Sequence, residues 1–416
     1  VFCRAICFAI SSTTCRNIMS KKLLLFLFEF GFLLKFQFIG ELSVSEVFLL
    51  MASFSLFSES DFLKKKYFRS LSYCYFFLIV AQIIASAFHP NNLLSNDLKG
   101  IAVPIVSLLH ILFLYRNCEA DYRLLGYAFA GYGTSIMAEW LFNGRVVEGE
   151  FAQLAFLKFT FVPALGGWLM LWLLYSKLSS RIKSLTYVFL GGLFVTLGTR
   201  SFGSFFFLPG AFSLLIANYK SLRDYRVVLP IMLIGGYSFY CLYTYLVLSG
   251  EITSGNTFQT LNLVNPYNPV NLLISGRTEI FAQWVAFTQK PLWGWGSWAD
   301  DPNMYFHRLM TIFKDVEGKI VLDNEDSLPN HSIIVGAGMT HGILALIAMF
   351  SIFVLIVKRS FQSLYARPHL VLPLLFVTVD FFWNMWFSPP SSFRYNITMD
   401  VVLILLIFAE TKKREI

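Results

Sequence analysis

The stretch SGRTEIFAQWVAFTQKPLWGWGSWADDPNMYFHR, residues 275–308, lies in the one long polar interval of an otherwise apolar sequence. This interval extends from Ser249 to about Ile333 and combines Trp, Arg, His and carboxylate side chains. Structureless connections of this length are uncommon in compact proteins. We therefore expect residues 249–332 to fold as a loop region that caps a bundle of helices and carries any chemistry that the protein performs.

The composition of the whole chain is that of a membrane protein. Hydrophobic residues make up 56% of the 416 residues, and charged residues make up 14%. So much apolar surface cannot be hidden in one water-soluble core, which indicates a polytopic membrane protein. The net charge of +8 would favour a nucleic-acid partner in a soluble protein. Here the basic residues lie mostly between apolar segments, so we attribute them to membrane topology and expect no nucleic acid.

Twelve apolar segments are candidates for membrane spans, which need roughly 20 apolar residues each. Nine lie within residues 19–248 and three within residues 333–416, and no repeat or linker divides the chain. They are residues 23–39, 45–57, 70–88, 101–115, 124–142, 152–176, 185–199, 203–217, 227–248, 333–356, 369–387 and 395–410. We expect a single all-α domain of about 12 transmembrane helices with one large extracytoplasmic loop.

The basic residues also predict the orientation of these spans. The connections on one side, together with both termini, carry most of the Lys and Arg residues. Such residues stay on the cytoplasmic side, so we predict that both termini are cytoplasmic and that residues 249–332 lie outside. Charged groups in hydrocarbon are costly unless they face the bundle or a wet cavity. We interpret the ionisable residues inside or near spans as snorkelling side chains or structural pairs; these are Glu29, Lys35, Glu139, Lys158 and Asp380.

The cysteines and the N-terminus carry less information. The six cysteines have no spacing typical of metal ligands, and none lies in the polar interval, so we expect neither a disulfide framework nor a zinc site. No cleavable signal peptide is evident. The sequence MSKKLLLF from Met19 is a more natural start than Val1, and we interpret residues 1–18 as a non-native extension.

Arg200 is the first of three candidate functional residues. It lies in TRSFG, residues 199–203, a very tight turn between two predicted spans. A guanidinium at the membrane boundary suits the phosphate of a lipid headgroup, and Ser201 and Gly203 would let a ligand approach the backbone. The alternative is an arginine that only anchors a helix end.

Arg277 opens a predicted amphipathic helix, because the apolar residues after it recur at spacings of three and four. With Ser275 as the expected N-cap, Arg277 lies in the first turn, where free amide groups add to its attraction for an anion. The alternative is an ion pair with Glu279. After Pro291, Trp295 and Trp298 lie in the glycine-containing segment LWGWGSW. They are either interface or core residues or surfaces on which a sugar ring stacks.

His331 is the candidate general base. Pro329 favours the first turn of a helix, with Ser327 or Leu328 just before it, so His331 lies at the outer end of the span at 333–356. A neutral imidazole, able to accept a proton, is favoured near a helix N-terminus. Gly342 falls on the same helix face, where it allows close packing or leaves room for a lipid chain. The alternative is a loop histidine without a role.

The acidic residues of the polar interval lack the matched spacing of a metal site. We interpret Asp300, Asp301, Asp323, Glu325 and Asp326 as a solvated loop. The sequence also has no Walker loop, dinucleotide fingerprint or Ser-His-Asp signature. We expect no metal and no cofactor, so an activated substrate must drive any reaction.

Four motifs together resemble the O-antigen ligase and O-antigen polymerase superfamily, bacterial membrane glycosyltransferases that use polyprenyl-linked sugars. His331, Ser332 and Gly342 match its His-(Asn/Ser/Gln)-x9-Gly pattern, and TRSFG resembles its Thr-Arg/Ser-Arg-Gly turn. SGR and PLWGWGSW resemble its arginine helix and Pro-Leu-x-Gly-x-Gly segment. The motifs cover roughly residues 185–360 in the family's order, and the span layout agrees with a GT-C-like fold. Ala345 stands where the family has Gly, Thr or Tyr, which favours polymerase over ligase.

The resemblance implies transfer of a glycan from undecaprenyl diphosphate to an acceptor sugar hydroxyl, without metal and with inversion, at the periplasmic face of the bacterial inner membrane. Arg200 and Arg277 would hold the diphosphate and His331 would act as base. Trp295, Trp298, Ser332 and Gly342 would contribute to substrate binding. The acceptor would be a lipid-linked glycan for a polymerase or lipid A core for a ligase, with a chain-length regulator as a further partner. A polysaccharide flippase is the alternative from another class. Transporters tend to place their functional groups at mid-membrane and to have halves related by a repeat, and the sequence shows neither feature.

Overall fold

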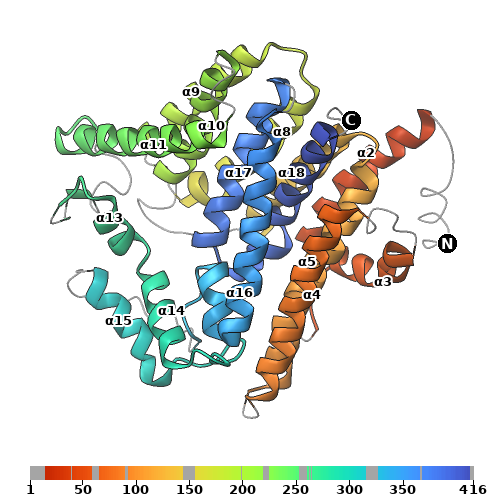
Figure 1. Ribbon diagram of the computed structural model, residues 1–416, viewed down its shortest axis with the longest axis vertical. Coiled ribbons are helices and arrows are strands. Elements are labelled where there is room, and N and C mark those ends of the chain that lie inside the picture. The colour runs from red at the N-terminus through yellow and green to blue at the C-terminus, as the bar shows by residue number, and fades with distance from the viewer. Residues whose placement is uncertain are drawn as a thin grey trace.

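The computed structural model describes most of the chain, and most of what it describes is helical (Figure 1). The described residues are 15–38, 40–58, 65–89, 92–143, 155–197, 199–218, 224–252, 260–261, 263, 265–314, 327–365 and 368–412. The predicted extension at residues 1–18 falls mainly outside them, as do Asp323, Glu325 and Asp326 of the acidic loop.

The elements before the polar interval are helices joined by short connections, with one small hairpin. The strands β1 (Lys35–Gln37) and β2 (Glu41–Ser43) pair antiparallel. The helices are α2 (Cys15–Phe30), η1 (Gly31–Leu33), α3 (Val44–Ser58), α4 (Lys66–Ala87), α5 (Leu94–Cys118), η3 (Tyr122–Leu124), α6 (Leu125–Asn143), the π-helix η4 (Leu157–Phe161), α8 (Val162–Tyr175), α9 (Ser180–Thr196), α10 (Arg200–Asn218) and α11 (Tyr225–Leu248).

The polar interval is itself partly helical, and long helices follow it. The elements are α13 (Pro269–Gly276), α14 (Thr278–Gln289), η6 (Pro302–Met304), α15 (Tyr305–Lys314), α16 (Ile333–Gln362), η7 (Ser363–Tyr365), α17 (Pro368–Phe387), η8 (Pro390–Arg394) and α18 (Asn396–Lys412).

Helices occupy all twelve positions at which apolar segments predicted spans. Six helical segments within the described residues are both long enough and apolar enough to cross a membrane, and α3 and α10 are shorter apolar helices. The six are Lys66–Ala87, Leu94–Cys118, Leu157–Tyr175, Pro230–Leu248, Ile333–Gln362 and Pro368–Phe387. The prediction of an all-α membrane protein is thereby confirmed, while the number of spans remains a prediction.

The predicted span at 23–39 is wrong at its C-terminal end. Helix α2 stops at Phe30, and the chain turns through η1 into the β1–β2 hairpin. A side chain at Gly31 would meet the Ser45 hydroxyl, which donates a hydrogen bond to the Phe28 carbonyl. Beyond this turn, Lys35 forms a salt bridge of 3.0 Å with Glu139 of α6. Both side chains remain partly exposed, so these two residues form a structural pair that is not buried.

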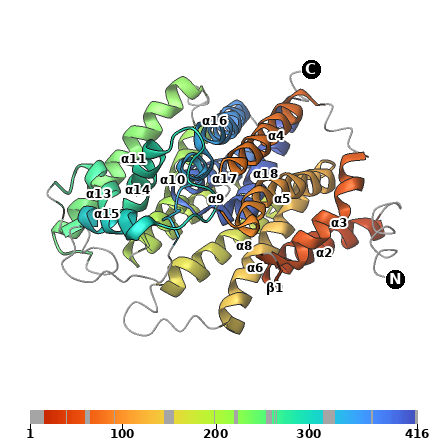
Figure 2. The same ribbon diagram turned by 90° about the horizontal axis from the view of Figure 1, so that it is seen from below.

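The centre of the bundle is α18, an almost wholly apolar helix. Its residues from Val401 to Ile407 are buried on every face, as expected for a helix surrounded by others. Helices α16, α17 and α5 pack around it, and Figure 2 shows α4 on one side of α17 and α18 and α11 on the other. Gly133 and Gly167 let α6 and α8 approach so closely that a Cβ at either would lie within 2.5 Å of a carbonyl oxygen.

Candidate functional site

A cavity of about 1140 Å³ lies between α6, the η4–α8 segment, α10, α17 and the start of α18. Its lining includes apolar and aromatic side chains, among them Phe129, Phe202, Phe205, Phe206, Phe376 and Met399. It also includes polar side chains: Glu139, Lys158, Thr160, Ser201, Asp380, Asn384, Ser388, Ser392 and Asn396. A lining that holds both kinds of side chain suits an amphipathic ligand that has an apolar chain and a polar head.

Arg277 and His331 both line this cavity, although they come from different elements of the polar interval. The Arg277 guanidinium carbon lies 5.3 Å from the ring centroid of Trp383 and 6.0 Å from that of Phe387. Burial lowers the pKa of Arg277 from its usual value, and the charge of Glu279 opposes this shift. A guanidinium partly removed from water attracts an anion more strongly than an exposed one does.

The position of Arg277 follows from a break between two helices. Asn268 caps α13 by accepting a hydrogen bond from the Val270 amide at 3.0 Å, with Pro269 at the first helical position. Arg277 ends α13 and adopts φ −143° and ψ 45°, and α14 begins at Thr278. The prediction of Ser275 as N-cap is therefore wrong, because the earlier cap places Ser275 inside α13. Arg277 itself stands at the N-cap position of α14.

His331 is exposed and lies two residues before the start of α16 at Ile333. The Ser332 hydroxyl accepts a hydrogen bond from the Val335 amide at 3.3 Å, so Ser332 is the N-cap. The expected helix start at Pro329 is wrong, because the Leu328 amide bonds to the Ala299 carbonyl at 2.9 Å and holds the segment extended. Ser332 is buried and caps the helix, and it is not part of the cavity lining.

Gly342 lies at a break inside α16. Its φ of +77° and ψ of −168° are not helical, so the prediction that it continues the helix face of His331 is wrong. Three backbone hydrogen bonds to the PLWGWG segment satisfy groups freed by the break: Trp295 N to Met339 O and Gly296 N to Thr340 O at 2.9 Å, and Ile343 N to Pro291 O at 2.8 Å. A broken helix is tolerated at membrane depth only when its backbone groups find such partners. The two motifs thus form one structural unit.

The predicted sugar-stacking tryptophans belong to this unit and do not line the cavity. Trp295 donates its indole N–H to the Ala286 carbonyl at 2.8 Å, and Lys290 Nζ lies 3.8 Å from its ring centroid. Trp298 is half exposed, with Lys99 Nζ 5.8 Å from its ring centroid. The tryptophans that do line the cavity are Trp140 and Trp383, neither of which was a predicted site residue.

Arg200 is the first residue of α10, and its side chain lies outside the described part of the chain. The tight turn before it is confirmed: the Thr199 amide and hydroxyl both donate to the Phe194 carbonyl, at 2.9 and 2.8 Å. Ser201, the next residue, lines the cavity. A Cβ at Gly203 would lie 2.5 Å from Val195 Cγ2, so this glycine serves the packing of α10 on α9 and not the approach of a ligand.

The cavity also contains Lys158, Asp380, Asn384 and Asn396, to which the sequence analysis gave no functional role. Ionisable residues within predicted spans are the signal that could have identified Lys158 and Asp380. Lys158 lies on the π-helix η4, a rare element that often occurs at functional sites. Within the described residues, no group of three or more His, Cys, Asp or Glu side chains is arranged to hold a metal ion.

Comparison with models of known protein families and with curated proteins finds no match to this sequence. The resemblance to the O-antigen ligase and polymerase superfamily is therefore a resemblance of the four sequence motifs alone.

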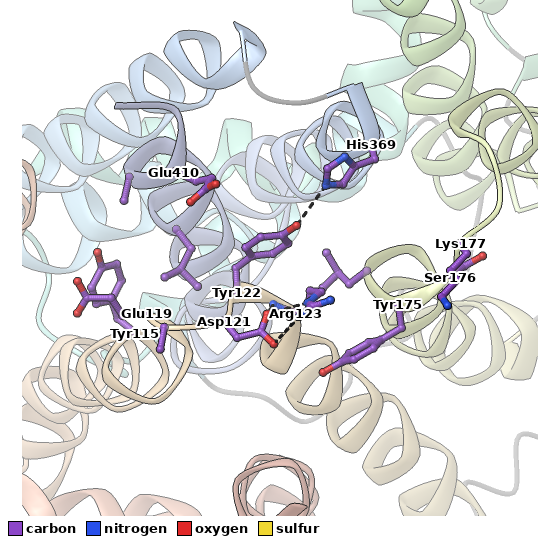
Figure 3. Close-up of a pocket in the computed structure, with 14 residues that line it drawn as sticks. Tyr115, Glu119, Asp121, Tyr122, Arg123, Tyr175, Ser176, Lys177, His369 and Glu410 are labelled. Carbon is purple, nitrogen blue, oxygen red and sulfur yellow. Dashed lines mark hydrogen bonds and ion pairs between the residues drawn. The ribbon is translucent and has the colours of Figure 1, made fainter. Parts of the chain in front are cut away.

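A second cavity, of about 600 Å³, lies where the ends of α5, α8 and α18 meet the start of α17 (Figure 3). The Tyr122 hydroxyl and His369 Nε2 are 3.2 Å apart, and Arg123 pairs with Asp121 at 2.9 Å. None of the predicted site residues lines it. The first cavity is therefore the candidate site, and His369 is a histidine that lies outside it.

Proposed function

We propose that the protein is a membrane glycosyltransferase of the O-antigen polymerase or ligase type, which moves a glycan from undecaprenyl diphosphate to an acceptor hydroxyl. The observation that supports this proposal is that Arg277 and His331 line one cavity whose wall holds both apolar and polar side chains. A polyprenyl diphosphate likewise combines an apolar chain with a charged head.

In the proposed reaction, Arg277, together with Arg200, neutralises the diphosphate as the glycosidic C–O bond breaks and negative charge develops on the leaving group. His331 accepts the proton of the acceptor hydroxyl while its oxygen bonds to the anomeric carbon. The products are the extended glycan, undecaprenyl diphosphate and a protonated His331, which returns its proton to solvent. Attack from the side opposite the diphosphate inverts the anomeric configuration. No metal is required, since guanidinium groups supply the positive charge.

The cellular setting is part of the same proposal. The protein would span the bacterial inner membrane about twelve times in a GT-C-like layout, with both termini in the cytoplasm and the cavity at the periplasmic face. The acceptor would be a second lipid-linked glycan, as for a polymerase, which Ala345 favours over lipid A core. A chain-length regulator would be a further partner of a polymerase.

Release of undecaprenyl diphosphate by the purified protein, incubated with a lipid-linked glycan, tests the proposal. Removal of a group that stabilises developing charge reduces kcat by about 10²–10³-fold, and we expect at least this loss in Arg277→Ala and His331→Ala. Arg308→Ala and His369→Ala remove the same kinds of side chain outside the cavity and should retain activity. Transport of the glycan without cleavage would instead indicate a flippase, and full activity in Arg277→Ala and His331→Ala would overturn the proposed roles.

A further inference from the structure

Four carboxyl and amide side chains gather where α17 and α18 face the cavity. Asp380 and Asn384 are one helical turn apart on α17, and Asn396 and Asp400 are one turn apart on α18. Asp380, Asn384 and Asn396 line the cavity, and Asp400, only 1% exposed, interacts with Asp380 from behind. We call these four residues the carboxamide cluster.

The carboxamide cluster has hydrogen-bonding capacity that its own contacts do not exhaust. Asn384 is 7% exposed, and its Oδ1 accepts a hydrogen bond from the Ser388 hydroxyl at 2.6 Å. Among the described residues, its buried Nδ2 has no partner other than the Asp380 carboxyl, which Asn396 and Asp400 also contact. An amide nitrogen has two hydrogens and a carboxyl oxygen has two lone pairs, so both groups can also pair with a ligand in the cavity.

The chemistry of these groups restricts the ligand. Asn384 Nδ2 requires an acceptor, and carboxyl oxygens require donors. A phosphate would be repelled by the carboxyls, and a cation would leave the Asn384 amide pointing its hydrogens at positive charge. A hydroxyl group accepts and donates at once.

Trp383 connects the carboxamide cluster to the charged part of the cavity. It lies between Asp380 and Asn384 in the sequence of α17, lines the cavity, and has the Arg277 guanidinium 5.3 Å from its ring centroid. A ligand whose anionic head binds Arg277 would therefore present its next unit to Trp383 and the cluster. For a lipid diphosphate, that unit is the sugar attached to the diphosphate.

We propose that Asp380, Asn384 and Asn396 bind hydroxyl groups of the sugar that is joined directly to the lipid diphosphate, with Asp400 as a positioning residue behind Asp380. This inference rests on the proposed function and adds to it the location of the donor sugar. The cluster thereby selects a glycan-bearing lipid over the product lipid, whose sugar has been transferred.

Binding of two lipids to the full-length protein in detergent tests the inference. The probes are undecaprenyl diphosphate N-acetylglucosamine and undecaprenyl diphosphate. We expect wild-type protein to prefer the sugar-bearing lipid by about tenfold or more, the effect of one or two hydrogen bonds to charged or buried groups. Asp380→Asn and Asn384→Leu should abolish that preference and leave the affinity for undecaprenyl diphosphate unchanged. Asn117→Leu alters an amide that is paired with Phe113 O on α5, outside the cavity, and should retain the preference.

The outcomes separate this inference from the proposed function. Equal binding of both lipids by wild-type protein would exclude the sugar site while a diphosphate site remained. Binding of neither lipid would overturn the proposed function and the sugar site together. If Asp380→Asn weakened the binding of both lipids equally, the cluster would have only a structural role. If the preference for the sugar-bearing lipid appeared only with added Mg²⁺, the cluster would bind a cation. Either result overturns the inference.

Discussion

Gln283 donates a hydrogen bond from its Nε2 to the side-chain oxygen of Asn330 at 2.8 Å. Gln283 is fully buried in the middle of α14, the helix that begins next to Arg277, and Asn330 directly precedes His331. Gly336 leaves room for this contact, because a Cβ there would lie 2.3 Å from Asn330 Oδ1. The hydrogen bond therefore helps to fix the position of His331 relative to Arg277.

Loss of the Gln283–Asn330 hydrogen bond should lower activity without removing any group from the cavity. We expect Gln283→Leu and Asn330→Leu each to reduce kcat/KM by about tenfold, because a buried unpaired partner costs roughly 1–3 kcal/mol. The double variant should lose little more than either single variant, since both break one contact. Rates of undecaprenyl diphosphate release measure the effect. Additive losses in the double variant would show that the two residues do not act through this contact.

Gly342 provides a test of the structural unit formed by the α16 break and the PLWGWG segment. A Cβ at this position would lie 2.0 Å from the Leu292 carbonyl oxygen, and the φ of +77° disfavours any side chain. We expect Gly342→Ala to destabilise the protein by about 2 kcal/mol or more, from steric and backbone strain together. Gly192→Ala is the matched control, because no atom lies within 4 Å of the added Cβ. Thermal unfolding in detergent compares the stabilities of the two variants. Similar melting temperatures would contradict the close packing and positive φ of Gly342 at the break in α16.

Arg277 should not be replaceable by lysine if its planar guanidinium binds a diphosphate. We expect Arg277→Lys to retain the positive charge but to lose bidentate geometry, and to lower kcat/KM by about tenfold or more. The contacts with Trp383 and Phe387 also favour a flat cation over an ammonium group. Affinity for undecaprenyl diphosphate, measured beside the release rate, should fall in the same variant. Wild-type affinity in Arg277→Lys would mean that Arg277 acts only as a point charge.

The sequence predicted the helices well because apolar length and periodicity are local properties. It also predicted that Arg200, Arg277 and His331 would meet. Arg277 and His331 line one cavity, while the side chain of Arg200 lies outside the described part of the chain. The functions of Gly342 and Trp295 were not predictable, because the break in α16 is defined by hydrogen bonds to a segment about fifty residues earlier. The carboxamide cluster was missed for a similar reason. Asp380 and Asp400 have no shared sequence motif, and only the packing of α17 against α18 brings them together.

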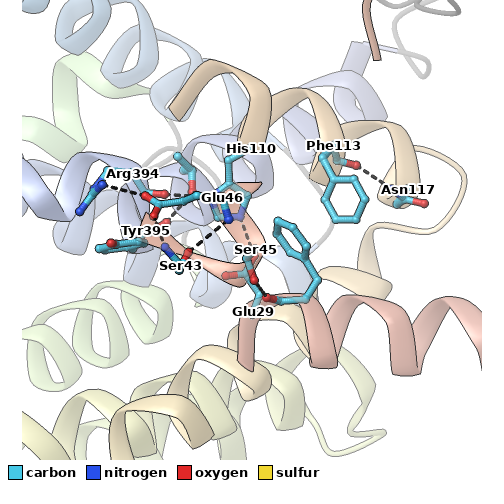
Figure 4. Close-up of polar contacts among 11 residues, drawn as sticks. Glu29, Ser43, Ser45, Glu46, His110, Phe113, Asn117, Arg394 and Tyr395 are labelled. Atoms are coloured by element: carbon cyan, nitrogen blue, oxygen red, sulfur yellow. Dashed lines mark hydrogen bonds and ion pairs between the residues drawn. The ribbon is translucent and has the colours of Figure 1, made fainter. Parts of the chain in front are cut away.

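A buried polar network joins α2, α3 and α5 to η8 (Figure 4). Glu29 Oε1 and His110 Nε2 are 2.6 Å apart, and both side chains are fully buried. The other ring nitrogen of His110 lies 2.9 Å from the Arg394 carbonyl oxygen, and the Arg394 side chain pairs with Glu46 at 2.8 Å. Arg394 ends η8, whose residue Ser392 lines the cavity. The network therefore supports the cavity wall from behind.

Removal of one partner of this network should lower the free energy of unfolding more than removal of both partners. We expect His110→Leu to destabilise the protein by about 3–5 kcal/mol, because it leaves the Glu29 carboxyl buried without its partner. The double variant Glu29→Leu/His110→Leu should recover much of that loss, since two apolar side chains of suitable size can replace a buried polar pair. Thermal unfolding of the two single variants and the double variant measures this coupling. If the double variant is as unstable as the sum of the single variants, Glu29 and His110 stabilise the bundle separately, and the network does not act as a unit.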